Sequence, residues 1–230
     1  MVDATDNNDT VTVDAAGNVT VLNRSTLATN TYAGATYTGL VIDVSGDNGI
    51  VNIATTLSYT GDAANPVNVN VDNRTIKESL DAVVTFTGLG AVDTSSGNAL
   101  GVVFAGGTGA DNLDVTPTGL GSALVQANGA GPMYDVTSAP ALTEIFAGTG
   151  NTLAFNGNTA GETFRADAGT VGAPADIMMF YTPSKFSSII FNGVGGNNSL
   201  TIDSSSGTAI NAGIIVFNGG SGGGNSLTLS

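Results

Sequence analysis

The sequence contains no cysteine, no histidine and no tryptophan, and only five of its 230 residues are lysine or arginine. Without cysteine there is no disulfide framework, and the redox compartment stays open. Without cysteine or histidine, nucleophilic catalysis would need a Ser–Lys pair built on Lys77 or Lys185. Ser184 and Lys185 follow Pro183 in an apparent loop that has no oxyanion signature. We therefore do not expect an enzyme.

The scarcity of basic residues leaves a net charge of −14. Neutralising phosphate requires lysine and arginine, so we expect no nucleic-acid partner and no docking on anionic lipid. No apolar run is long enough to cross a bilayer, which predicts no membrane insertion. The opening stretch MVDATDNND lacks the basic and apolar regions of a signal peptide, so export would need a signal outside this sequence.

The residues that are abundant point to a folded β protein. Glycine occurs 33 times, apolar residues make up 41% and the mean hydropathy is +0.22. Acidic disordered chains are instead low in hydrophobicity and dense in charge. Apolar and polar residues alternate with period two over residues 10–23, 40–61 and 67–73, which predicts strands joined by short turns. Residues 75–86 carry the only pattern that predicts a short helix, and within them Val83, Val84 and Phe86 return to a strand pattern.

A repeat dominates the later part of the chain. Each unit has apolar residues ending in phenylalanine, a glycine-rich turn, Asp or Asn, and then x-Leu-x-apolar; the units are VVFAGGTGADNLDV (102–115), EIFAGTGNTLAF (144–155), IIFNGVGGNNSLTI (189–202) and IVFNGGSGGGNSLTL (215–229). The four phenylalanines, at 104, 146, 191 and 217, are spaced by 42, 45 and 26 residues. A solenoid coil takes roughly 20 to 30 residues. The first two gaps therefore predict two coils each, and the last gap predicts one coil. Phe164 would mark an intermediate coil.

The predicted fold class is therefore all-β. A parallel β-helix or β-solenoid explains the repeat best, because stacked strand–turn–strand units bury a continuous apolar column. An antiparallel β-sandwich is the alternative, since the early strand pairs resemble hairpins. We expect residues 1–100 to form an N-terminal β-rich segment, and residues 101–230 to form glycine- and asparagine-rich solenoid repeats continuous with it.

One turn matches a calcium-binding consensus. Residues 106–114 fit the nonapeptide G-G-x-G-x-D-x-U-x, which makes Asp111 the candidate metal ligand. The equivalent turns carry Asn151, Asn198 and Asn225, whose neutral oxygens attract a divalent cation less strongly. The pattern thus favours stacking turns with an asparagine ladder and no cofactor, and Ca²⁺ is the one cofactor left open.

Two further groups have a structural and a functional interpretation. Arg165 lies close in sequence to Glu162 and Asp167, as a polysaccharide-active β-helix enzyme would require. Because residues 165 and 167 share a face on a strand, an ordinary surface ion pair is favoured. The apolar run from Met178 to Tyr181 predicts a buried strand, with a partner-binding patch as the alternative.

Several segments resemble a family of very long, repeat-rich surface proteins of planctomycetes and related bacteria. These proteins carry degenerate hemolysin-type (RTX-like) repeats of the forms NGGxGNDxLTV and NGTAGADTFTV. Residues 156–164, NGNTAGETF, are similar to the second form, with Glu162 in place of the usual Asp. The similarity covers residues 102–230 and extends to residues 1–100 only in style. It implies an exported β-solenoid segment and is compatible with calcium, although Asn and Glu replace Asp at most turns.

The sequence thus predicts a structural segment of a large extracellular or bacterial cell-surface protein, a stiff solenoid for adhesion, display or filament assembly. The expected partners are the rest of a larger parent polypeptide, a second copy stacked on an exposed end coil, and a surface glycan or protein. The alternatives are a calcium-dependent RTX-like folding module and a β-helix polysaccharide-active enzyme.

Overall fold

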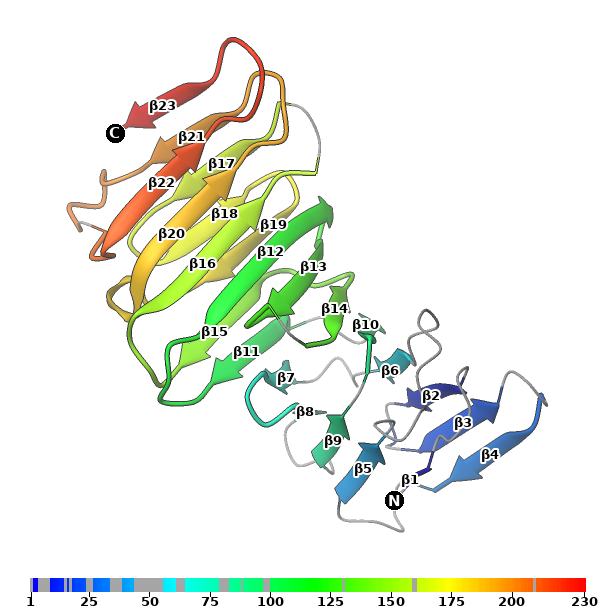
Figure 1. The fold of residues 1–230 in the computed structure, drawn as a ribbon. Coiled ribbons are helices and arrows are strands. Elements are labelled where there is room, and N and C mark those ends of the chain that lie inside the picture. Colours follow the sequence, from blue (N-terminus) through cyan, green and yellow to red (C-terminus); the bar gives the residue numbers. More distant parts are fainter. Residues whose placement is uncertain are drawn as a thin grey trace.

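The chain folds into two facing β-sheets that run the length of the molecule (Figure 1). The computed structural model describes residues 2–3, 9–14, 16, 18–23, 27–33, 39–43, 56–60, 65–78, 83–87, 89–96, 100–129, 131–158, 161–208 and 210–230. Sheet A has twelve strands and sheet B has eleven. The prediction of an all-β chain is confirmed: the described residues contain no α-helix, and only Pro183–Lys185 form a short 3₁₀ turn. No described helix has the length and apolarity needed to cross a bilayer.

Both sheets mix strands from the two halves of the sequence. The strands of sheet A, in spatial order, are β1 (Val2–Asp3), β5 (Gly39–Asp43), β9 (Val83–Thr87), β8 (Thr75–Glu78), β7 (Val67–Asn70), β11 (Val102–Gly106), β15 (Leu142–Phe146), β19 (Ile177–Phe180), β18 (Thr170–Ala173), β17 (Thr163–Ala166), β21 (Ser199–Ile202) and β23 (Ser226–Leu229). Those of sheet B are β22 (Ile214–Asn218), β20 (Phe186–Asn192), β16 (Asn151–Asn156), β12 (Asn112–Gly119), β13 (Ser122–Ala127), β14 (Met133–Val136), β10 (Ala91–Ser96), β6 (Thr56–Thr60), β2 (Asp9–Val13), β3 (Val19–Asn23) and β4 (Thr29–Tyr32).

The chain passes back and forth between the sheets, and each coil stacks on the previous one through parallel strand pairs such as β11–β15 and β16–β20. Among the described strands, antiparallel pairs occur only within four three-stranded meanders, β2–β3–β4, β7–β8–β9, β12–β13–β14 and β17–β18–β19. The meanders alternate between sheet B and sheet A. The architecture therefore stacks coils as a β-solenoid does and includes the hairpins expected of the sandwich alternative.

The meanders correct the coil count taken from the phenylalanine spacing. Phe104 and Phe146 lie on neighbouring strands, β11 and β15, so the 42-residue gap is one coil enlarged by the β12–β13–β14 meander and not two coils. Their register is also offset, because Phe104 pairs with Glu144 and Gly106 pairs with Phe146. The last gap, from Phe191 to Phe217, is one plain coil, as expected.

The predicted short helix is wrong over residues 75–78, whereas the strand pattern expected at Val83, Val84 and Phe86 is confirmed. Residues 75–78 form β8 and residues 83–87 form β9, and the two strands pair antiparallel in sheet A. Ile76, Val84 and Phe86 are completely or almost completely buried, at the period of two that a strand requires. Residues 79–82 lie outside the described part of the chain.

The predicted strand pair over residues 10–23 is confirmed as β2 and β3. Asp14 fixes the turn between them: its carboxylate accepts the backbone N–H groups of Ala16 and Asn18 at 3.0 and 2.8 Å. Residues 40–61 also contain two strands, β5 and β6, although these belong to different sheets and residues 44–55 lie outside the described part. The predicted strand at 67–73 is β7.

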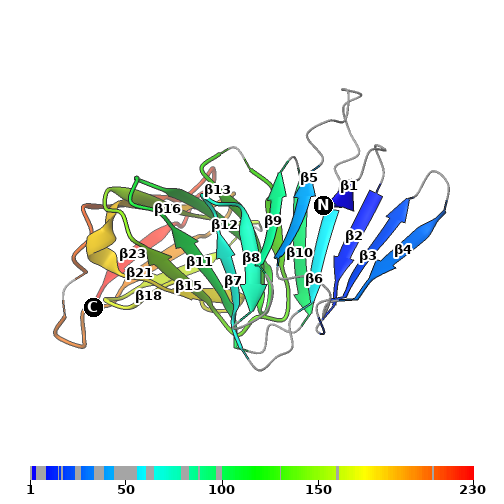
Figure 2. The same ribbon diagram turned by 90° about the horizontal axis from the view of Figure 1, so that it is seen from below.

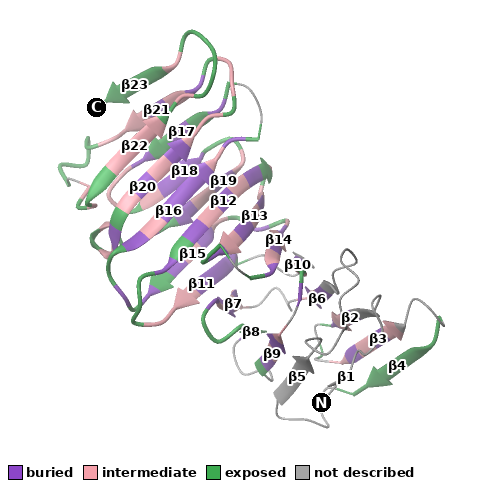
Figure 3. Ribbon diagram, in the orientation of Figure 1, coloured by how far each residue is buried: buried purple, intermediate pink, exposed green. Residues whose placement is uncertain are grey.

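A single apolar core lies between the two sheets (Figure 3). In sheet B, Phe155, Phe191 and Phe217 occupy the same position on three successive strands, and the rings of Phe155 and Phe191 stack at 6.2 Å. In sheet A, Phe164 and Leu200 pair in register. Phe164 contacts Phe191 across the core at 5.4 Å between ring centroids. Each fully buried phenylalanine contributes roughly 2 kcal/mol, so the column holds the coils in register.

Candidate functional site

Asparagine side chains connect the turns of successive coils, and two of them, Asn151 and Asn198, are fully buried. Asn151 Oδ1 accepts the N–H of Asp111 at 2.8 Å, Asn198 Oδ1 accepts that of Glu162 at 2.8 Å, and Asn225 Oδ1 accepts that of Asn198 at 2.9 Å. Each asparagine also donates its side-chain amide to the carbonyl three residues earlier in its own turn, at 3.1 to 3.3 Å. We call this arrangement the turn ladder, and it confirms the asparagine ladder expected from the repeat.

Asp111 occupies the ladder position of an asparagine and is buried, with 2% of its surface exposed. Its Oδ1 accepts the side-chain N–H of Asn128 at 3.0 Å, while its Oδ2 is buried without a hydrogen-bond partner. In the turn of Asn151, the corresponding side-chain atom is the amide nitrogen that donates to the Gly148 carbonyl. A carboxylate oxygen cannot donate a hydrogen bond, so Asp111 Oδ2 cannot make the bond that the amide nitrogen of Asn151 makes in its own turn.

A second carboxylate lies beside it. Asp72, in the turn after β7, accepts the N–H of Gly107 through Oδ2 at 2.5 Å. Burial raises the pKa of Asp111, the hydrogen bond from Asn128 lowers it, and the negative charge of Asp72 raises it further. The parallel pairing of β7 with β11 brings the two turns together, although the two aspartates are far apart in the sequence.

The paired glycines of the consensus make room for these two carboxylates. A Cβ atom at Gly106 would collide with Asp111 Oδ2, and one at Gly107 would lie 2.5 Å from Asp72 Oδ2. The same relation recurs without acids, since a Cβ atom at Gly193 would lie 2.5 Å from Asn198 Cγ. The glycines are thus required by the packing of the turn side chain, whether that side chain is Asp or Asn.

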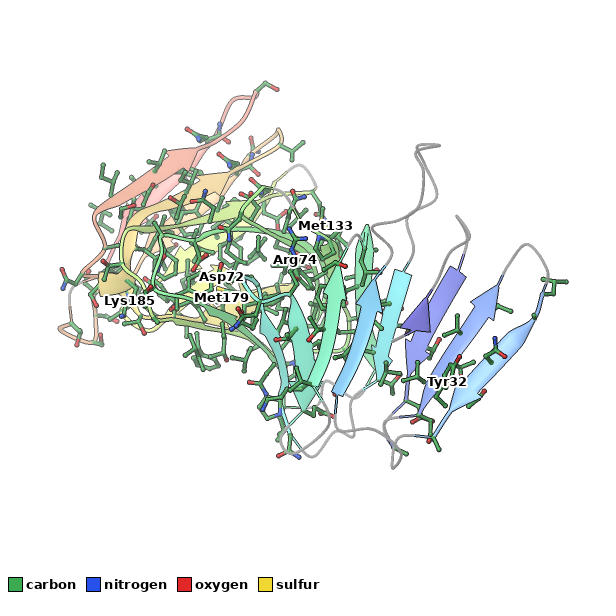
Figure 4. The ribbon with its side chains drawn as sticks, turned by 60° about the horizontal axis from the view of Figure 1, so that its bottom comes forward. Tyr32, Asp72, Arg74, Met133, Met179 and Lys185 are labelled. Atoms are coloured by element: carbon green, nitrogen blue, oxygen red, sulfur yellow. The ribbon has the colours of Figure 1, made fainter. Side chains whose placement is uncertain are left out.

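A cavity of about 150 Å³ lies beside Asp72 and Asn128, the residue whose side-chain amide donates to Asp111. Its lining includes Asp72, Arg74, Asn128 and Tyr134. Asp72 and Arg74, which lie in the turn after β7, are labelled in Figure 4, as is Met133 at the start of β14. The cavity is large enough for a few water molecules, and its lining brings one carboxylate, Asp72, and one guanidinium, Arg74, to the same space. The described residues contain no group of three or more acidic, histidine or cysteine side chains suited to a metal.

The acidic and basic residues around Arg165 do not form one cluster. Arg165 pairs with Asp203 at 2.9 Å and with Asp167 at 3.6 Å, all three at the surface, which confirms the ion pair with Asp167. The turn ladder has two separate runs, Asp111 with Asn151 and Glu162 with Asn198 and Asn225. Glu162 is buried at the start of the second run, where its N–H donates to Asn198.

The apolar run from Met178 to Tyr181 and the side chain of Lys185 have structural roles. Met179 and Tyr181 are buried, which confirms the predicted strand, whereas Phe180 has 54% of its surface exposed on the outside of sheet A. Lys185 lies in the short 3₁₀ turn, and its Nζ donates to the carbonyl of Ala147 at 2.9 Å.

The sequence pattern found Asp111 and missed Asp72, Asn128 and Arg74. Two of these residues adopt a left-handed backbone, with φ of 52° at Arg74 and 56° at Asn128, which non-glycine residues adopt in tight turns. The stretches VDNR and NG mark those turns in the sequence. They give no sign that the turns meet the one before β12.

Comparison with known proteins adds no relative: no family model, no curated protein and no solved structure matches this chain.

Proposed function

We propose that this chain is a structural segment of a large extracellular or cell-surface protein, a stiff β-solenoid that serves adhesion, display or filament assembly. One observation carries the proposal: the same residue types recur in register on successive strands, as Phe155, Phe191 and Phe217 do in the core. Bending such a stack would open the sheet hydrogen bonds and the turn ladder together, so the segment resists bending.

The outer face supports the same function. Asn192 donates its side-chain amide to Asn156 at 2.8 Å, and Asn218 donates to Asn192 at 2.7 Å, so the ladder of amides continues on the outside of sheet B. Ser199 and Thr163 also contact each other in register. A regular surface of uncharged hydrogen-bonding groups offers many weak contacts to a glycan or a protein.

Small-angle X-ray scattering from dilute protein tests the proposal. A stiff solenoid gives a rod-like profile with a constant cross-section, which stays unchanged when salt is raised because the core is apolar. A flexible or compact profile would contradict it. Antibodies raised against the chain should also label intact source cells, and labelling only after lysis would contradict a surface location.

Calcium-dependent folding is the second candidate, favoured by the unpartnered Oδ2 of Asp111 beside Asp72. These two carboxylates would hold the cation, which would join the turns of two successive coils. A melt followed by circular dichroism, with Ca²⁺ and then with EDTA, tests this candidate on the wild type and on Asp111→Asn. A bound ion stabilises only the folded state, so EDTA would lower the melting temperature of the wild type alone. An unchanged wild-type melt would rule this candidate out.

A further inference from the structure

The cavity beside Asp72 lies between two turns that belong to different meanders. One wall is the turn after β7, with Val71, Asp72 and Arg74. The other wall is formed by the end of β13, the β13–β14 turn and Tyr134 of β14. Figure 2 shows β7 and β13 in the middle part of the molecule, between its N-terminal and C-terminal ends. Both walls are thus built from residues in the interior of the sequence.

Hydrogen bonds hold both walls in place. On the first wall, the carbonyl of Arg74 accepts the N–H of Phe86 at 3.0 Å. On the second wall, Asn128 donates its N–H to the carbonyl of Asn112 at 2.8 Å, and its Oδ1 accepts the N–H of Asn112 at 2.8 Å. A ligand therefore meets a preformed surface, which lowers the entropic cost of binding.

The lining includes a phenol hydroxyl that has no partner in the described chain. Only 1% of the surface of Tyr134 is exposed, and its ring packs edge-on against Phe86 and Phe104, at 6.5 and 5.6 Å between centroids. Its hydroxyl makes no hydrogen bond with any residue that the structure describes. Burial raises the pKa of Tyr134 to about 12, and the charge of Arg74 offsets only part of this effect, so the hydroxyl keeps its proton at neutral pH. A buried O–H without an acceptor is unfavourable, and a ligand oxygen would remove that cost.

Two side chains of opposite charge line the same cavity. Asp72 accepts one hydrogen bond from the described residues, from the N–H of Gly107, and a carboxylate has room for more. The guanidinium of Arg74 makes no ion pair among the described residues, in contrast to that of Arg165, which pairs with Asp203 at 2.9 Å. Asp72 would repel an anion, and Arg74 would repel a cation. Neutral hydroxyl groups suit both, because each can accept from the guanidinium and donate to the carboxylate.

The size and the apolar part of the lining define the ligand further. The volume is about 150 Å³, and a cavity of that volume can hold one six-membered ring. Val71, Ala127 and Pro132 provide an apolar surface for ring carbons, while the three polar side chains supply hydrogen bonds. A pyranose combines these features, since the faces of its ring are apolar and its edge carries neutral hydroxyl groups.

We propose that this cavity binds a single pyranose residue of a neutral surface glycan. Arg74 and Tyr134 donate hydrogen bonds to its hydroxyl groups, and Asp72 accepts hydrogen bonds from them. The proposal rests on the adhesive function proposed above, to which it assigns a ligand and a site. One ring held by three polar side chains binds weakly, with an expected dissociation constant on the order of 1 mM.

A nuclear magnetic resonance titration of the full chain tests the proposal. The probes are the methyl glycosides of glucose, galactose, mannose and N-acetylglucosamine, each added to about 20 mM, roughly twenty times the expected dissociation constant. At least one glycoside should saturate and shift the backbone N–H signals of residues 72, 74, 128 and 131. Acetate, which Asp72 repels, and glycine, which leaves most of the cavity empty, should bind at least about tenfold more weakly.

Four variants separate binding from folding. Arg74→Met and Tyr134→Phe should weaken binding of that glycoside roughly 10-fold and 5-fold, because each removes a hydrogen bond to it. Arg165→Met and Tyr181→Phe are the matched controls and should leave binding unchanged. The Tyr181 hydroxyl donates to the carbonyl of Asp167 at 2.8 Å, so Tyr181→Phe should lower the midpoint of urea unfolding. Tyr134→Phe should not lower it, because its hydroxyl has no protein partner to lose.

Four outcomes would overturn the proposal: no shift with any of the four glycosides, shifts confined to residues away from the cavity, tighter binding of acetate or glycine, or binding that survives both Arg74→Met and Tyr134→Phe. The solenoid itself is judged separately by scattering, so a failure of sugar binding leaves the structural role standing.

Discussion

Asn198 offers the sharpest test of the turn ladder. Its side chain is fully buried and makes three hydrogen bonds: Oδ1 accepts the N–H of Glu162, and Nδ2 donates to the carbonyls of Gly195 and Gly219 at 3.1 and 2.8 Å. The Asn198→Ala variant would leave the buried N–H of Glu162 and the partly buried carbonyls of Gly195 and Gly219 without their present partner. We expect it to destabilise the fold strongly.

The magnitude follows from the groups left behind. A buried polar group without its partner costs about 1–3 kcal/mol, and water will reach part of the space that the amide vacates. We therefore expect a loss of about 3–5 kcal/mol for Asn198→Ala. Asn225→Ala is the matched control, because Asn225 has the same role in the last coil but is partly exposed. Solvent can replace its bonds, so the expected loss is about 1 kcal/mol or less.

Two measurements check this prediction. Urea unfolding followed by circular dichroism gives the loss of stability, although a solenoid can unfold in parts and the transition must be tested for two-state behaviour. Hydrogen exchange gives a local result: the N–H of Glu162 should be protected in the wild type and in Asn225→Ala, and exchange quickly in Asn198→Ala. Equal losses for the two variants, or a Glu162 N–H that remains protected in Asn198→Ala, would refute the ladder as a source of stability.

Three more substitutions test other parts of the fold and site. Gly193→Ala places a Cβ atom 2.5 Å from Asn198 Cγ and should cost about 1–3 kcal/mol in urea unfolding, while Gly223→Ala, which has open space, should cost under about 1 kcal/mol. Asp111→Asn in EDTA at pH 7 should raise the melting temperature by about 2–4 °C, since the amide restores a ladder donor. Because the folded-state pKa of Asp111 is raised, the wild type should lose stability as the pH rises above its ordinary value of 3.8, and the variant should lack this component. Glu144→Gln should lose about 1–3 kcal/mol by denaturation, because both buried carboxylate oxygens accept backbone N–H groups and an amide nitrogen cannot.

The parts of the fold that depend on local pattern were predictable. The alternation in β2, β3 and β7 indicates strands, and the recurring Gly-rich turn followed by Asn indicates a stack in which the same side chain meets itself at every coil. Both signals arise because one strand face is buried and one corner is repeated. The pairing of Phe191 with Phe217 follows directly from two coils of nearly identical sequence.

The meanders were not predictable for a physical reason. A corner that sends the chain to the other sheet and a hairpin that returns it to the same sheet both need short, glycine-containing turns. Gly119 and Gly121 at the β12–β13 hairpin have positive φ, as does Gly196 at a corner. The strands of a meander alternate apolar and polar residues just as the coil strands do. The two cases differ in which strand the next segment pairs with: β13 pairs antiparallel with β12, and β14 then pairs with β10, a long-range contact that the local sequence does not encode.

The candidate site shows the same division. Asp111 stands in a nine-residue motif, and its burial could be expected from the turn. Asp72 belongs to a turn nearly forty residues earlier, and it reaches Asp111 only because β7 pairs with β11 across a coil boundary. The spacing of residues along the sequence does not show which turns stack on each other. A site built from two turns, such as Asp72 with Asp111, therefore cannot be predicted from the motif in one of them.

The position of the acidic residues follows from how a turn ladder works. Each interior asparagine must accept an N–H from the preceding coil and donate to its own turn, and a carboxylate can do only the first. The first residue of a ladder, which we call its head, has no earlier ladder residue to accept from. It needs only to donate its own backbone N–H to the asparagine of the next coil. Asp111 and Glu162 both occupy such head positions, one in each ladder, and both are buried. Acidic side chains are therefore tolerated in this fold at the first position of a ladder. That position is where a solenoid of this kind can carry an ionisable group in place of an asparagine.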